Sequence, residues 1–123
     1  MIVIIGILAA IAIPLFLNQR KKGVDASMKS DAKSAATTVE TWMVDNPTTA
    51  TPTVAVVAGA AGTSALVGFK GSTGNALNLT AGTEGVGTYC IDVKNASSSE
   101  PLKFIVYRSE SGGLQATFAD AGC

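Results

Sequence analysis

Residues 1–17, MIVIIGILAAIAIPLFL, contain no charged and no polar side chain. At about 1.5 Å per residue, a helix of this length reaches ~26 Å, close to the ~30 Å hydrocarbon core of a bilayer. Because the apolar run is already under way at Met1, we expect further apolar residues upstream of it. A helix that is apolar on every side must be surrounded by lipid or by other helices. We therefore expect residues 1–23 to form a hydrophobic helix that is transmembrane at some stage.

Two other interpretations of this segment are weaker. A secretory signal peptide carries its basic residues before the apolar run, whereas Arg20, Lys21 and Lys22 follow it here. A buried helix of a soluble protein needs a large domain around it, and a chain of 123 residues leaves too little to enclose one.

The helix is predicted to continue as an amphipathic one over residues 24–45. Its apolar residues recur every three or four positions, which places them on one face. They are Val24, Met28, Ala32, Ala35, Val39 and Trp42. The charged residues Asp25, Lys29, Lys33 and Glu40 are assigned to other faces. Asp45-Asn46-Pro47 marks the end of the helix, because a residue before proline disfavours the α conformation.

The remainder of the chain is predicted to be a small sheet. Residues 46–65 are rich in Thr, Ala, Val, Gly and Pro, and they are expected to form a surface connection with a weak strand at 54–57. Short segments rich in Val, Ile, Tyr, Phe and Thr at 66–69, 76–79, 86–93, 102–108 and 114–118 are predicted to be antiparallel strands. The expected fold class is α+β, with a head at 24–123 whose sheet covers the apolar face of the helix.

The string GILAAIAIP, followed by LFLNQR, closely resembles the N-terminal segment of type IV pilins and pseudopilins. The resemblance covers about twenty residues, and the remainder matches the family only in layout. It implies the type IV pilin fold and a structural subunit of a pilus filament at the bacterial cell surface, with a membrane-embedded pool before assembly. The partners it implies are further copies of the chain, an inner-membrane assembly platform and a prepilin peptidase. The family's processing site, methylated N-terminal residue and nearby glutamate would precede Met1.

In such a filament the apolar halves of many helices would pack together in the core. The residues expected to make these contacts are Ile5, Gly6, Ile7, Leu8, Ala9, Ala10, Ile11, Ala12, Ile13, Pro14, Leu15 and Phe16. The alanines allow close helix approach. Pro14 lacks an N–H and clashes with the carbonyl four residues earlier, so we expect a kink or local melting of the helix between Gly6 and Pro14.

Cys90 and Cys123 are the two cysteines of the chain. An even number in a membrane-anchored chain indicates one disulfide in an extracytoplasmic setting. Two unrelated thiols remain the alternative, and metal binding is poorly supported because the chain has no histidine. In the pilins that the sequence resembles, a disulfide often encloses a C-terminal loop.

Other function classes find little support. Nine basic residues balance nine acidic ones, which gives no specific signal for nucleic acid. Five of the basic residues lie between Arg20 and Lys33, where contact with anionic lipid is plausible. We predict no catalytic residue, metal site or cofactor, and not an enzyme. A pseudopilin of a type II secretion system is the main alternative, and a single-span membrane-anchored binding domain is a weaker one. Adhesion, motility and DNA uptake stay open among the roles of a pilus.

Overall fold

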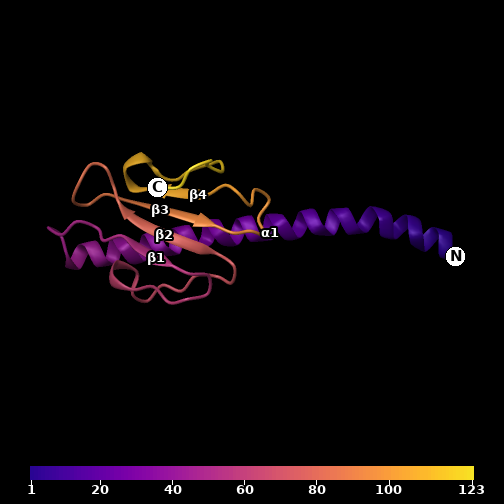
Figure 1. Ribbon diagram of the computed structural model, residues 1–123, viewed down its shortest axis with the longest axis horizontal. Helices are drawn as coiled ribbons and strands as arrows, with labels where there is room; N and C mark the ends of the chain where they lie inside the picture. Colours follow the sequence, from indigo (N-terminus) through magenta and orange to yellow (C-terminus); the bar gives the residue numbers. More distant parts are fainter.

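The computed structural model describes all residues, 1–123, as one long helix and a five-stranded antiparallel sheet, which is an α+β fold. Helix α1 (Ile2–Asp45) packs its C-terminal half against the sheet, and its N-terminal half projects away alone (Figure 1). The strands are β1 (Val54–Val56), β2 (Ala76–Ala81), β3 (Tyr89–Lys94), β4 (Ile105–Arg108) and β5 (Gly113–Leu114).

Helix α1 is 44 residues long, about 66 Å at 1.5 Å per residue. It ends at Asp45, as the sequence predicts. The backbone N–H of Asn46 donates to the carbonyls of Trp42 and Met43. The side-chain amide of Asn46 adds a bond of 2.9 Å to the Trp42 carbonyl, so the last turn is closed before Pro47. The helix continues through Pro14 without interruption. Kinking or melting between Gly6 and Pro14 therefore stays a prediction for the assembled state.

The sheet is a meander in which each strand pairs antiparallel with the next one along the chain. The longest pairing joins β2 to β3 and places Leu77 opposite Val93 and Leu79 opposite Ile91. These four side chains share one face, because alternate residues of a strand point the same way. That face lies on α1, and each of the four is at most 1 % exposed.

One predicted strand is wrong. Residues 66–69 do not join the sheet; the chain forms the 3₁₀ helix η1 (Ser64–Leu66) followed by a turn. The N–H of Leu66 donates to Thr63 and that of Phe69 to Leu66, so local bonds satisfy the backbone here. Gly68 has a φ of +91°, a conformation that breaks an extended strand and that glycine adopts readily. Leu66 and Phe69 of this segment instead belong to the buried cluster that packs on α1, whereas Val67 is exposed.

Other strands begin later or end earlier than predicted. β3 begins at Tyr89 and not at 86, because Gly85 and Gly87 both have positive φ and form a turn. β4 begins at Ile105 and not at 102, because the N–H of Lys103 closes a turn onto the Glu100 carbonyl. β5 has two residues, and beyond Leu114 the chain keeps only single backbone contacts with the β4 segment, from Gln115 to Val106 and at the isolated bridge between Phe104 and Ala119. The strand at 54–57 is confirmed as β1, one residue shorter.

Candidate interaction surface

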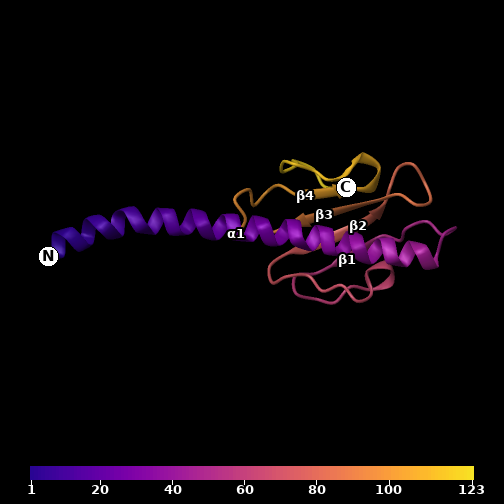
Figure 2. The same cartoon turned by 180° about the vertical axis from the view of Figure 1, so that it is seen from behind.

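The most unusual surface of the molecule is the projecting half of α1. Its large apolar side chains are all exposed, for example 88 % at Ile2, 64 % at Ile11 and 67 % at Phe16. By length and composition this helix could cross a membrane, and none of its most apolar stretch is covered by the head. Figure 2 shows the same half from behind, equally free of the sheet. Water is a poor solvent for such a surface, so it needs lipid or protein partners.

Every residue predicted to pack in a filament core lies on this projecting half, and each one is exposed. They are Ile5, Gly6, Ile7, Leu8, Ala9, Ala10, Ile11, Ala12, Ile13, Pro14, Leu15 and Phe16. The structure brings none of them into contact with the head, so the whole circumference of the helix is available here. Nothing lies within 4 Å of the position that a Cβ would take at Gly6, so this glycine is not required by a contact within the chain.

The head holds α1 through the face that the apolar spacing predicts. Met28, Ala32, Ala35 and Val39 are each 0 % exposed and belong to one hydrophobic cluster with the sheet. Val24 and Trp42, at the two ends of the series, are partly buried against that cluster. The cluster fixes the direction in which the projecting half leaves the head, because the two halves are one continuous helix.

A buried polar network adds direction to this contact. Asp31 of α1 is 6 % exposed and accepts bonds from the backbone N–H of Ser72 at 2.7 Å and from its hydroxyl at 2.8 Å. The side-chain amide of Asn75 donates to the same carboxylate at 2.8 Å and to the hydroxyl of Ser27 at 3.0 Å. Asn95 in turn donates to the Asn75 side chain at 2.6 Å. The turn before β2 thereby binds the carboxylate directly, and Asn95, which follows β3, is linked to it through Asn75.

Two further carboxylates of α1 contact the head at its edges. The hydroxyl of Tyr89 donates to Glu40 at 2.8 Å, and Tyr89 is itself 0 % exposed. Burial, and then the hydrogen bond to Glu40, raise the pKa of Tyr89 well above its ordinary value. Nearer the projecting half, Asp25 accepts bonds from the backbone N–H and the hydroxyl of Ser99.

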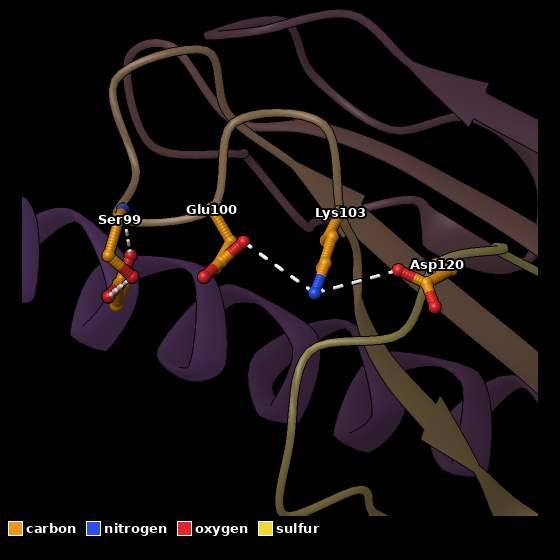
Figure 3. A network of polar contacts seen from close by, with 5 residues as sticks. Ser99, Glu100, Lys103 and Asp120 are labelled. Carbon is orange, nitrogen blue, oxygen red and sulfur yellow. Dashed lines mark hydrogen bonds and ion pairs between the residues drawn. The ribbon is translucent and has the colours of Figure 1, made fainter.

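Ser99 belongs to a polar turn that lies over α1 (Figure 3). In this turn the ammonium of Lys103 lies 3.7 Å from Glu100 and 3.6 Å from Asp120. All three charged side chains are substantially exposed, so these ion pairs contribute little to stability. They do place a lysine between two carboxylates at one rim of the head.

Cys90 and Cys123 form a disulfide that closes a loop of sequence separation 33. It lies on the face of the sheet away from α1, next to the buried carboxylate of Asp92. Asp92 accepts bonds from the Asn78 amide at 3.0 Å and from the N–H of Cys123 at 3.4 Å. The disulfide, Asp92 and the backbone bonds of Gln115 and Ala119 to the β4 segment together hold residues 115–123 against the sheet.

Sequence reasoning missed the polar contacts between helix and head. Asp25 and Glu40 were assigned to faces away from the apolar one, but they border it and each accepts a bond from the head. Asp31 was not singled out at all, although it lies three residues after Met28 and one before Ala32, at the edge of the predicted face. A carboxylate flanking an apolar stripe is the available signal, but its partners come from distant loops that no local pattern predicts.

No group of three or more His, Cys, Asp or Glu side chains is arranged to hold a metal ion. Comparison of the chain with protein-family models, with curated proteins and with solved structures gave no match. The structure by itself defines a class: a small α+β head fixed on a long helix, whose uncovered apolar half is a candidate membrane anchor or signal segment.

Proposed function

We propose that this chain is the structural subunit of an extracellular type IV pilus, a helical polymer of identical copies. One observation carries the proposal. A single uninterrupted helix supplies the core of the head with one half and a fully exposed apolar surface with the other. The sequence GILAAIAIP, which resembles the pilin N-terminal segment, lies entirely within the exposed half.

Burial in a bundle keeps the exposed half out of water once the helix has left the bilayer. Each apolar side chain removed from water contributes about 25 cal/mol per Å² of area, and the projecting half is exposed all round. Many parallel copies would bury these surfaces in a central bundle, with the heads outside. The rigid connection between helix and head then gives every head the same orientation relative to the bundle.

The same surface suits a membrane before assembly, since ~30 Å of hydrocarbon covers a helix of this length. Under this proposal the chain is first a membrane protein, and an inner-membrane assembly platform and a prepilin peptidase are its partners. In the polymer, neighbouring helices could accommodate an opened backbone between Gly6 and Pro14 at lower cost than lipid, where unpaired backbone groups are expensive.

A pseudopilin of a type II secretion system is the second candidate, because the helix supports it equally. The disulfide-closed segment 90–123 and the Thr-rich connection before β1 favour the pilus. A binding domain on a membrane tether is a weaker candidate. A tether has no need to continue as the same helix into the hydrophobic core of its head, as α1 does here. An enzymatic role has no visible support in the sequence, since the chain contains no histidine to act as an imidazole base.

Shearing the producing cells tests the proposal. The material released from the surface is analysed by mass spectrometry beside the membrane fraction of the same cells. The pilus predicts that this chain is the main protein of the sheared fraction. Its confinement to the membrane fraction, with no surface fibre containing it, would favour the pseudopilin or the tethered domain.

A further inference from the structure

Three basic residues follow shortly after the apolar run of α1. Arg20, Lys21 and Lys22, here called the basic collar, are exposed. Neither ion pair of the molecule involves them. At about 1.5 Å per residue Lys21 lies roughly 6 Å along the helix beyond Leu17, the last residue of the apolar run. When the span is inserted, the collar therefore lies at the depth of the lipid headgroups.

A second feature of the head lies just beyond the collar along the helix. The turn of residues 100–103 has Pro101 and Leu102 at its tip, and Leu102 is 81 % exposed. Asp25 holds the turn to α1 through Ser99, three residues and about 4.5 Å of helix beyond Lys22. In Figures 1 and 2 the β3–β4 connection, which contains this turn, lies at the end of the head that faces the projecting helix.

We propose that the basic collar and the tip of this turn form one surface that rests on an anionic lipid membrane. The phosphates of the headgroups would bind Arg20, Lys21 and Lys22, and the Leu102 side chain would enter the apolar edge of the leaflet. This inference rests on the membrane-inserted stage of the proposed function. It adds to the proposed function a preference for anionic lipid and a defined position of the head on the membrane surface before assembly.

The charges of the two features favour lipid over a second copy of the chain. The collar has three positive charges without a partner in its own chain, directly beside an apolar span. Glu100 of the turn and Asp120 of the C-terminal segment already share Lys103, which leaves them less charge to offer another copy. An anionic lipid surface supplies both the phosphates that the collar needs and the hydrocarbon that Leu102 needs.

The test uses the full chain in vesicles of phosphatidylcholine that contain about 20 % phosphatidylglycerol. Spin-labelled lipids of both kinds report, by electron paramagnetic resonance, which lipid occupies the protein boundary. We expect phosphatidylglycerol to be preferred about threefold or more at low salt. The preference should fall towards unity in Lys21→Gln/Lys22→Gln and in high salt. The matched control is Lys33→Gln/Lys70→Gln, which removes two exposed lysines of the head and should keep the preference.

A second measurement tests the turn itself. In a Trp42→Phe background, Leu102→Trp places the only tryptophan of the chain at the tip of the turn. Brominated lipids should quench its fluorescence, and Lys21→Gln/Lys22→Gln should reduce that quenching. A tryptophan that is not quenched would overturn the claim that the tip of the turn enters the lipid leaflet.

The outcomes separate the inference from the proposed function. If carbonate extracted the protein from the vesicles, the helix would not span the bilayer. The inference and the proposed function would then both be contradicted. An inserted chain without lipid preference would overturn the inference alone. If Lys21→Gln/Lys22→Gln abolished self-association and left lipid preference unchanged, the collar would face a second copy, which also overturns it.

Discussion

The carboxylate of Asp31 accepts two hydrogen bonds from Ser72, one from its backbone N–H at 2.7 Å and one from its hydroxyl at 2.8 Å. The two residues are 41 positions apart, so the contact fastens the turn before β2 to the middle of α1. Hydrophobic packing alone allows a helix to slide or rotate on a sheet, whereas these bonds have a defined direction. Asp31 therefore fixes the register between the head and the apolar half of the helix.

Replacing Asp31 by alanine should destabilise the head by about 3 kcal/mol, because the N–H of Ser72 and the amide of Asn75 lose a charged acceptor in a buried site. Urea unfolding of the full chain in detergent, followed by the fluorescence of the single tryptophan, measures this. Asp45→Ala is the matched control on the same helix, since Asp45 is exposed, and it should change stability by less than about 0.5 kcal/mol. Equal effects of the two substitutions would contradict the account of Asp31.

Tyr89 should make the head sensitive to alkali. Its pKa in the folded protein is raised by burial and by Glu40, whereas in the unfolded chain it is about 10. Below pH 10 both states keep the proton and stability does not depend on this group. Above pH 10 the unfolded state loses its proton first and is favoured, so the free energy of unfolding should fall by about 1.4 kcal/mol per pH unit.

The comparison of wild type with Tyr89→Phe isolates this effect from the titration of lysines. Urea unfolding at pH 8 to 11 should show a steeper fall in wild type than in Tyr89→Phe. At neutral pH the loss of the Glu40 bond should lower the stability of Tyr89→Phe by about 1 kcal/mol. Parallel pH profiles for wild type and Tyr89→Phe would refute this role.

The disulfide should contribute strongly to a head of this size. Closing a loop of separation 33 is worth about 3 to 4 kcal/mol in the chain-entropy model. Cys90→Ser/Cys123→Ser should therefore unfold at clearly lower urea, and limited proteolysis should begin within residues 115–123. Indistinguishable urea midpoints for the oxidised protein and this variant would show that Asp92 and the sheet hold the segment unaided.

The exposed half of α1 should be needed for assembly and not for folding of the head. Ile11→Asp introduces a charge into the surface that we propose to be buried in the filament, at a cost of about 3 kcal/mol or more per subunit. Fibres should be lost from the sheared fraction, while the disulfide and the tryptophan fluorescence stay unchanged. Val57→Asp is the control, because Val57 is a similarly exposed apolar residue of the head, and it should assemble.

The helix and most of the sheet could be predicted from the sequence because their signals are local. The apolar run, the spacing from Met28 to Val39 and the proline after Asn46 define α1 to within a residue at its C-terminal end. Strand pairs flanked by glycine turns likewise emerge from short patterns. Residues 66–69 misled the prediction because apolar composition does not distinguish a strand from a buried 3₁₀ turn, and the conformation of Gly68 decided the outcome.

The contacts between α1 and the head could not be predicted, for a physical reason. Asp31, Ser72, Asn75 and Asn95 are brought together by folding over long sequence separations, and each residue alone is an ordinary polar residue near a turn or helix edge. The exposed half of the helix is the reverse case. Its need for partners is visible in the sequence, but the identity of those partners depends on molecules outside the chain.

Helical reconstruction by cryo-electron microscopy of the sheared fibres tests the central claim most directly. We predict a polymer of this chain with residues 1–23 bundled at the axis and the heads outside, and its density would also show whether the backbone between Gly6 and Pro14 has opened. Fibres in which this helix lies at the outer surface, or fibres built from another protein, would contradict the account.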